Sequence, residues 1–205
     1  MPENTRDKLI TVANELFYAN GFHAVGIDQI LDRVGVTKTT FYNHFDSKDE
    51  LVIAVLLERD RIEMAEWLAI MERKGGDDPR ARILALFEML EDWLADPAFK
   101  GCMFLKAGAE YPSPNDPVHQ AALVHGRNIF EALRLQAERA GAASAESLAG
   151  QLMMVLSGAI LTRESTGLID RARTARATAG VIVDHHLPQT PARAPSRRAS
   201  TRTGH

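Results

Sequence analysis

Apolar residues recur at intervals of three and four along most of this 205-residue chain, and this spacing constrains the fold more than any other feature. In the first such segment, Leu9, Ala13, Leu16 and Phe17 share one helix face, and Asn20-Gly21 is typical of a helix end. We find no run of alternating β-branched residues bounded by turn residues, which is the pattern of a strand. The sequence therefore predicts an all-α fold.

Capping residues, glycines and prolines divide the chain into predicted helices. Thr37 is a good N-cap for the third helix, and Ser47-Lys48-Asp49-Glu50 forms a capping box that starts the fourth. Gly75-Gly76 and Pro79 mark the end of the fourth helix. The first predicted helix follows the capping candidates Asn4 and Thr5 and stops at Asn20-Gly21. The later predicted ranges are 27–34, 38–45, 47–74, 80–96, 103–111, 117–140, 144–167 and 170–186.

Composition and charge restrict the class of protein. One cysteine excludes an intramolecular disulfide and indicates a reducing compartment. The N-terminus lacks an apolar signal segment, and the most apolar run, Leu152–Leu161, is about half the ~20 residues that cross a bilayer. We therefore expect a cytoplasmic protein without a membrane span. The net charge is −3, and the first fifty residues hold five basic against eight acidic residues, so composition alone does not indicate a nucleic-acid binder.

The helix lengths divide the chain into three predicted parts. Residues 1–47 form a small helical domain, and residues 48–187 form a larger one. Residues 188–205 combine Arg193, Arg197, Arg198 and Arg202 with Pro, Ser, Thr and Ala, which predicts a disordered basic tail. This tail is either solvated without function or adds non-specific affinity for phosphates.

The predicted third helix has one apolar face and one polar face. Phe41 and Phe45 lie together on the apolar face, and because so short a helix is unstable alone, they must pack on the first two helices. Thr39 and Asn43 lie on the opposite face. Thr40 and Tyr42 flank this polar face, and Lys38 and His44 lie at its margins.

Two short helices joined by a tight turn at Gly35 form a helix-turn-helix, whose second helix presents its N-terminal residues to the major groove of DNA. Threonine contacts the thymine methyl, lysine reaches guanine acceptors and asparagine pairs with adenine. The helix N-termini and Lys48 favour phosphate. The competing interpretation is a buried helical hairpin in which Thr and Asn only cap and solvate.

Gly35-Val36-Thr37, followed by Phe41-Tyr42-Asn43-His44-Phe45 and Lys48-Asp49-Glu50-Leu51, resembles the DNA-binding domain of TetR-family repressors. The resemblance implies a homodimeric bacterial regulator that binds a palindromic operator. It further implies that the protein releases this operator when a small molecule enters the larger domain.

Positions carried over from the family divide into two groups. Thr37, Tyr42, His44 and Lys48 are expected to contact mainly phosphates, and Lys38, Thr39, Thr40 and Asn43 to lie nearer the bases. The chain departs from the family pattern at Gly26, where a Thr or Ser usually caps the second helix. Gly26 cannot supply that side-chain contact.

The helix predicted at 144–167 is apolar almost all round, which indicates cover on more than one side. By resemblance, it and the last helix form a four-helix dimer interface with their symmetry mates. The residues expected there are Leu148, Leu152, Val155, Leu156, Ala159, Ala172, Ala175, Ala179 and Val183.

By the same resemblance, the larger domain holds a cavity for a small, largely apolar effector. The expected wall residues are Trp67, Met71, Phe87, Trp93, Met103, Phe104, Glu110, Tyr111, Met153 and Met154. The competing interpretation is that these side chains fill an ordinary core. Glu110 either bonds an effector or is solvated at a helix end, and Cys102 is either a sensor thiol at a helix N-terminus or a buried apolar residue.

No metal or cofactor is expected, because the histidines show no ligand spacing and no glycine-rich phosphate loop follows a strand. Two alternatives to a ligand-responsive repressor remain. One is a constitutive DNA-binding repressor without an effector. The other is an all-helical enzyme that uses Glu110 and a histidine as acid and base.

Overall fold

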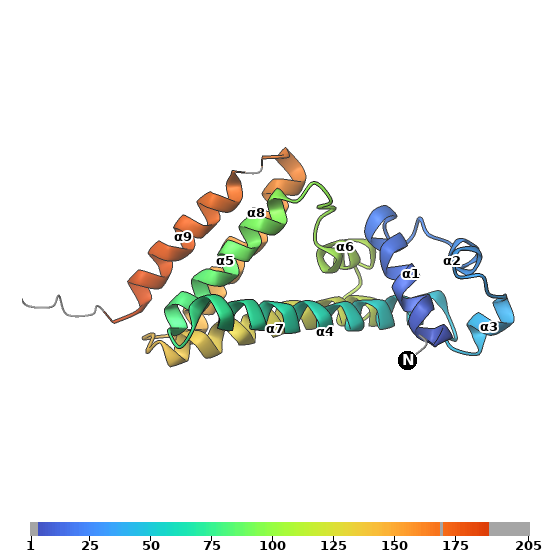
Figure 1. The fold of residues 1–205 in the computed structure, drawn as a ribbon, viewed down its shortest axis with the longest axis horizontal. Coiled ribbons are helices and arrows are strands. Elements are labelled where there is room, and N and C mark those ends of the chain that lie inside the picture. The colour runs from blue at the N-terminus through green and yellow to red at the C-terminus, as the bar shows by residue number, and fades with distance from the viewer. Residues whose placement is uncertain (1–3, 169, 189–205) are drawn as a thin grey trace, which may run out of the picture.

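The computed structural model describes residues 4–168 and 170–188, and within these ranges every regular element is an α-helix (Figure 1). The predicted all-α fold is confirmed. A three-helix bundle at one end of the molecule contains α1 (Thr5–Asn20), α2 (Ile27–Val34) and α3 (Lys38–Tyr42). The larger helical domain contains α4 (Lys48–Gly75), α5 (Pro79–Ala95), α6 (Met103–Glu110), α7 (Pro117–Arg139), α8 (Ala145–Thr166) and α9 (Arg171–His186). The predicted tail lies outside the described residues except for Pro188.

The three-helix bundle encloses an aromatic core. Phe17, Phe22 and Phe41 are fully buried, and the ring centroids of Phe17 and Phe22 lie 5.2 Å apart. Gly35 ends α2 with φ at 79°, in the left-handed region that favours glycine. Thr37 then caps α3 by accepting a hydrogen bond from the backbone N–H of Thr40 at 3.2 Å. This turn and cap form the predicted helix-turn-helix.

The α3 helix ends earlier than expected, at Tyr42 rather than at position 45. After Tyr42 the chain tightens, because the backbone N–H of His44 donates to the carbonyl of Phe41 at 2.8 Å, three residues back. This turn brings Phe45 under the bundle, where its ring centroid lies 5.7 Å from that of Phe41. The expected pairing of the two phenylalanines is confirmed, although only Phe41 belongs to the helix.

The long helix α4 links the bundle to the larger domain. Its 28 residues begin after Ser47, whose hydroxyl accepts the N–H of Glu50 at 3.1 Å, as the capping box predicts. The Glu50 carboxylate accepts the N–H of Asp46 at 2.5 Å. Because α4 packs on α1 and also on α5 and α7, it belongs to both parts of the molecule.

The α8 helix packs between α7 and α9 in the larger domain. It is long and apolar enough to cross a membrane by length and composition, with a mean hydropathy of 1.3 in its most apolar window. This window is longer than the run Leu152–Leu161, from which no membrane span was expected. Leu148, Leu152 and Leu156 are buried against the rest of the chain, as in a core helix, so this single helix is weak evidence for a membrane span.

Candidate functional site

The first candidate site is the outer face of α3 and its flanks. Lys38, Thr39, Tyr42, Asn43 and His44 are exposed. Thr37 is exposed as well, and Thr40 and Lys48 are partly buried. The structure therefore gathers all eight residues that the sequence predicts for DNA contact on or beside one short helix. Among the described residues, the side chains of Thr39, Asn43 and His44 make no hydrogen bond or ion pair, which leaves their polar atoms available to an external partner.

Lys38, unlike these three residues, is already paired. Its Nζ lies 2.8 Å from Oδ1 of Asp28 on α2, and the hydrogen bond to Asp28 raises the pKa of Lys38. Both side chains are more than half exposed, so the pair is weak. Asp28 therefore competes with any phosphate or base for the ammonium group of Lys38.

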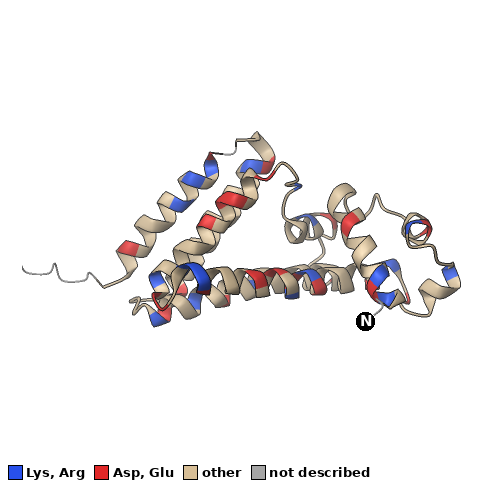
Figure 2. Cartoon of the chain, in the orientation of Figure 1, with Lys and Arg blue, Asp and Glu red and all other residues tan. Residues whose placement is uncertain are grey.

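Lys and Arg are spread over the whole molecule rather than gathered on the three-helix bundle (Figure 2). Any affinity of this bundle for DNA must therefore come from the positions of a few side chains, not from a strongly basic surface.

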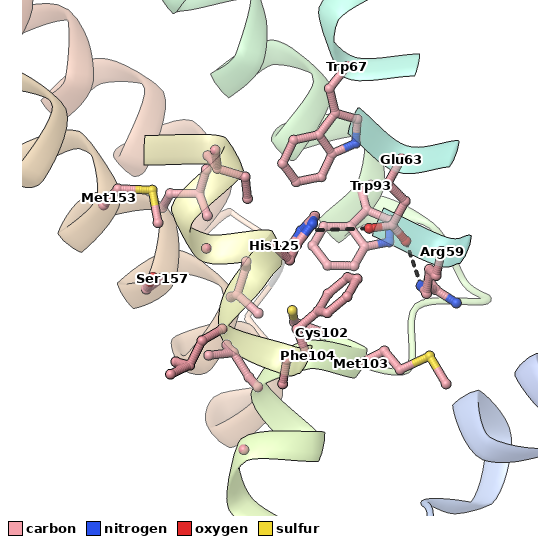
Figure 3. Close-up of a pocket in the computed structure, with 18 of the residues that line it drawn as sticks. Arg59, Glu63, Trp67, Trp93, Cys102, Met103, Phe104, His125, Met153 and Ser157 are labelled. Atoms are coloured by element: carbon pink, nitrogen blue, oxygen red, sulfur yellow. Dashed lines mark ion pairs between the residues drawn. The ribbon is translucent and has the colours of Figure 1, made fainter. Parts of the chain in front are cut away.

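The second candidate site is a cavity of about 320 Å³ in the larger domain, between α4, α5, α6, α7 and α8 (Figure 3). The structure places five residues of the predicted effector site on its walls, namely Trp67, Trp93, Met103, Phe104 and Met153. Cavities of this size, apolar with a few polar groups, are typical of small-molecule sites.

The other five predicted wall residues lie elsewhere. Met71 and Phe87 are buried in the core away from the cavity, and Met154 is 68% exposed on the outer face of α8. Glu110 and Tyr111 lie at the contact between α6 and the three-helix bundle. A helical pattern identifies apolar positions but not which of them border an opening, so we remove these five residues from the candidate effector site.

One wall of the cavity carries a buried polar network that the sequence analysis missed. His125 Nδ1 lies 2.8 Å from Asp60 Oδ1, and Asn128 donates to Asp60 Oδ2 at 2.7 Å. Glu63 Oε2 lies 3.8 Å from His125 Nε2, and Glu63 Oε1 lies 2.6 Å from Arg59 Nε. Burial lowers the pKa of His125, against the opposing effect of Asp60 and Glu63.

A sequence signal for one side of this network existed. Arg59, Glu63 and Trp67 are four residues apart, so they share one face of α4. The partner side, with His125 and Asn128 on α7, could not be assigned because it meets α4 only in the folded chain.

Cys102 also lines the cavity, and its thiol does not have the lowered pKa that a position at a helix N-terminus alone would give. It is the N-cap residue of α6 and is 8% exposed. Burial raises the pKa of its thiol, and the two hydrogen bonds from backbone groups of α6 only oppose this effect. Of the two interpretations left open for Cys102, its burial agrees with the buried apolar residue.

Glu110 fastens the end of α6 to the three-helix bundle. Its Oε1 accepts the backbone N–H of Phe22 at 3.0 Å, and its Oε2 accepts the backbone N–H of His23 at 2.7 Å and lies 2.9 Å from His23 Nδ1. Burial alone would raise the pKa of Glu110, but these hydrogen bonds lower it. We call this contact the α6 latch. Glu110 is thus neither an effector contact nor a solvated helix end.

Neighbouring side chains extend the α6 latch. The rings of Tyr111 and His23 stack with centroids 4.7 Å apart, and the Tyr111 hydroxyl donates to Asp49 at the start of α4. Gly21 precedes the latch with φ at 88°, and a Cβ added there would lie 2.9 Å from Oε1 of Glu110. The latch therefore joins α6, the α1–α2 turn and the first turn of α4.

The residues expected in the dimer interface are mostly buried within one chain. Leu148, Leu152, Ala172, Ala179 and Val183 have no exposed surface, and Leu156, Ala159 and Ala175 are at most 6% exposed. Val155 is partly buried. The eight buried residues pack α8 and α9 against each other and against α5 and α7, so we correct their assignment to the interface, whereas the assignment of Val155 stays a prediction. The apolar residues that face outward on the same two helices are Met154, Leu161 and Val181, which are 50% to 71% exposed.

The described residues contain no group of three or more His, Cys, Asp or Glu side chains placed to hold a metal ion. Glu110 lies 2.9 Å from Nδ1 of His23, and neither residue lines the cavity that holds His125.

Comparison with known protein families identifies two matching regions. Residues 9–55 match the family model described as bacterial regulatory proteins of the tetR family. Residues 79–179 match the model described as the tetracyclin repressor-like C-terminal domain. The first region contains α2 and α3, and the second contains most of the cavity walls.

Two curated relatives match parts of the chain. The transcriptional activator FasR of Mycolicibacterium smegmatis is 48% identical over 54 residues, which are 26% of this chain and 25% of the relative. The transcriptional repressor NemR of Escherichia coli is 27% identical over 131 residues, which are 63% of this chain and 65% of the relative. The chain thus covers less than two thirds of the length of either protein.

A solved structure matches nearly the whole fold. A TetR-family transcriptional regulator from Streptomyces coelicolor superposes with a TM-score of 0.81 at 28% sequence identity. The superposition covers 89% of this chain and 95% of that protein.

Proposed function

The chain belongs to the TetR family of bacterial regulatory proteins, and we propose that it is a ligand-responsive repressor that binds a palindromic operator as a homodimer. In this proposal a small, largely apolar molecule binds the cavity and releases the operator. The observation that carries the proposal is α4, which begins with Lys48 beside the α3 face and forms one cavity wall with Arg59, Glu63 and Trp67.

The α3 face supports the DNA part of the proposal. Thr39 and Asn43 present unpaired polar atoms at the exposed side of a helix-turn-helix, and such atoms can read base edges in the major groove. Thr37, Tyr42, His44 and Lys48 surround them and are suited to phosphate contacts, which position a protein on DNA.

The α6 latch supports the coupling between the two sites. Residues 103–105 and Gly108 of α6 line the cavity together with the N-cap Cys102, and Glu110 at the end of α6 holds the α1–α2 turn. A molecule that shifts α6 or α4 therefore changes the position of the three-helix bundle. Ligand binding and operator binding are then linked through two states, and the coupling must be reciprocal.

The outward apolar residues of α8 and α9 support the homodimer. Met154 and Leu161 lie on α8, and Val181 lies on α9, all more than a third exposed in a single chain. A two-fold pairing of these helices buries all three side chains and presents two α3 helices to a palindrome.

The test is selection of binding sites from random duplex DNA at near-physiological salt, with a Thr39→Ala, Asn43→Ala variant in parallel. We expect the wild-type protein to enrich an inverted repeat, and the variant to enrich altered half-sites or none. A folded, dimeric wild-type protein that enriches no sequence, after removal of any co-purified small molecule, contradicts the proposal.

A screen with the selected operator distinguishes the proposal from a constitutive repressor. A molecule that occupies the cavity must change both the melting temperature and the operator affinity. Transcription in vitro from a promoter that carries the operator then shows whether the protein represses.

A further inference from the structure

One wall of the cavity is polar, and its hydrogen bonds leave two acceptor atoms without a donor among the described residues. We call Arg59, Asp60, Glu63 and His125 the polar corner. Nδ1 of His125 lies 2.8 Å from Oδ1 of Asp60, and because a carboxylate oxygen only accepts, Nδ1 carries the ring proton. Burial lowers the pKa of His125, so at neutral pH the ring stays neutral and Nε2 keeps its lone pair.

A second acceptor faces this lone pair. Oε2 of Glu63 lies 3.8 Å from Nε2 of His125, while Oε1 of Glu63 is held by Arg59 (Figure 3). Arg59 is held in turn by Asn14, at 3.3 Å, and by the ring of Tyr18. Two acceptors therefore converge on one point, and no side chain among the described residues places a donor between them.

The charges of the polar corner do not balance. Asp60 and Glu63 are two carboxylates against the single guanidinium of Arg59. The other titratable groups on the walls are His119, whose Nδ1 lies 2.7 Å from the carbonyl oxygen of Tyr111, and the buried thiol of Cys102. A positive charge placed at the corner offsets the excess, and buried carboxylates favour such a partner.

Aromatic rings surround the corner. The Phe104 ring stacks on His125 with centroids 3.8 Å apart, and the Trp67 ring meets His125 edge-on at 5.3 Å. Trp93 closes the cavity from α5. Indole and phenyl faces attract cations, and the rest of the wall, which includes Met153, is apolar apart from His119 and Ser157.

We propose that the effector of this cavity is a hydrophobic amine, whose protonated primary or secondary nitrogen donates to both Glu63 Oε2 and His125 Nε2. Its apolar body then lies against Trp67, Trp93 and Met153. This inference rests on the proposed function and narrows its ligand from a largely apolar molecule to a cationic one. An alcohol has one donor for two acceptors, and a carboxylate adds negative charge, so both fit the corner less well.

The test compares three probes of similar size on the full chain by calorimetry at neutral pH: phenethylamine, phenethyl alcohol and phenylacetate. Glu63→Gln removes the charge and keeps the shape. Glu66→Gln makes the same change at an exposed position of α4 outside the cavity and serves as the matched control. Operator affinity without ligand is measured on every sample.

We expect the wild-type protein and Glu66→Gln to bind phenethylamine at least about tenfold more tightly than phenethyl alcohol, because bonds to charged groups are the stronger ones. Glu63→Gln is expected to lose this preference and to keep its affinity for the alcohol. Equal or tighter binding of the alcohol or the acid overturns the inference, and so does an unchanged preference in Glu63→Gln or no binding of any probe.

If Glu63→Gln does not fold, the ranking of the three probes by the wild-type protein decides alone. Operator binding that persists without an amine preference overturns only this inference. Failure to select an operator overturns the proposed function, whatever the ranking.

Discussion

The polar side chains of the α3 face and those of the polar corner differ in exposure and in hydrogen bonding. On the α3 face, Thr39, Asn43 and His44 are exposed and have no side-chain partner among the described residues. In the polar corner, Asp60 and His125 are less than 10% exposed, and both are bonded to other side chains. The first region depends on an external partner for its hydrogen bonds, whereas the second is built before any ligand arrives. Substitutions on the α3 face should therefore change binding, and substitutions of Asp60 or His125 should change stability.

The largest expected effect is the loss of stability in Asp60→Ala. This change leaves the Nδ1–H of His125 and the amide of Asn128 buried without their acceptor. We expect the free energy of unfolding to fall by about 3 kcal/mol, as for a broken buried network. Urea denaturation measures it. Glu58→Ala, which breaks an exposed pair with Arg61 on the same helix, should change stability little. An equal loss of unfolding free energy in the two variants would show that the buried network is no more important for stability than an exposed ion pair.

The opposite result is expected for Thr39→Ala, Asn43→Ala. We expect operator affinity to fall by about 2 kcal/mol, or roughly thirtyfold, because two base contacts are lost. The melting temperature should not change, since neither side chain bonds within the described chain. Fluorescence anisotropy with the selected operator measures the affinity, and Thr174→Ala, at an exposed position on α9, is the control. A lower melting temperature would show that the α3 face is structural.

The α6 latch joins the two regions, and Glu110→Gln should loosen it. Glutamine keeps one oxygen acceptor but loses the charge that strengthens the bonds from the N–H groups of Phe22 and His23. We expect these two amides to exchange hydrogen about fivefold faster, for a loss of about 1 kcal/mol. Nuclear magnetic resonance measures the exchange. Glu138→Gln, at an exposed ion pair with Arg134, should leave both rates unchanged.

The latch also predicts a pH dependence. The pKa of Glu110 in the folded chain is lowered from its ordinary value of 4.5. Its contribution to stability is therefore complete above that value and is lost as the pH falls through the folded pKa. The amide shifts of Phe22 and His23 should titrate together with a midpoint below 4.5, and Glu110→Gln should abolish this titration. A midpoint above the ordinary value would mean that burial outweighs the hydrogen bonds.

The smallest effect is expected for Asp28→Asn. Lys38 loses its exposed partner, and a negative charge leaves the vicinity of the α3 face. We expect operator affinity to rise about twofold at low salt and the gain to vanish at high salt. Asp7→Asn, in the first turn of α1, serves as the control for the change in net charge. A weaker affinity in Asp28→Asn would indicate that Asp28 orients Lys38 for its contact.

The α3 region could be predicted from the sequence because its residues are consecutive. Gly35, Thr37 and Ser47 act on neighbours three or four residues away, so local chemistry sets the turn and the two caps. The error at the end of α3 is local as well. A helix that continues to position 45 and a tighter turn after Tyr42 both bring Phe45 close to Phe41. The spacing of the two residues therefore did not reveal the turn.

The cavity and the latch depend on contacts that the sequence does not show. Glu110 accepts a hydrogen bond from Phe22, which is 88 residues away in the sequence. Asp60 and its partner His125 are separated by 65 residues. Helix α8 adds a different difficulty, because it is apolar on all sides. The pattern cannot tell the side that packs on its own chain, with Leu152, from the side that faces outward, with Met154.

The α6 latch has a consequence for how such a protein can change over generations. Glu110 binds the peptide N–H groups of Phe22 and His23, and every residue except proline supplies an N–H. No α3 side chain takes part in these two bonds, so the α3 side chains, and with them the DNA sequence preferred, can vary without loss of the latch. The constraint falls instead on Gly21, where any added side chain meets both an unfavourable φ and the carboxylate of Glu110. The DNA preference of the α3 face can thus change while the α6 latch is kept, and all such variants retain Gly21.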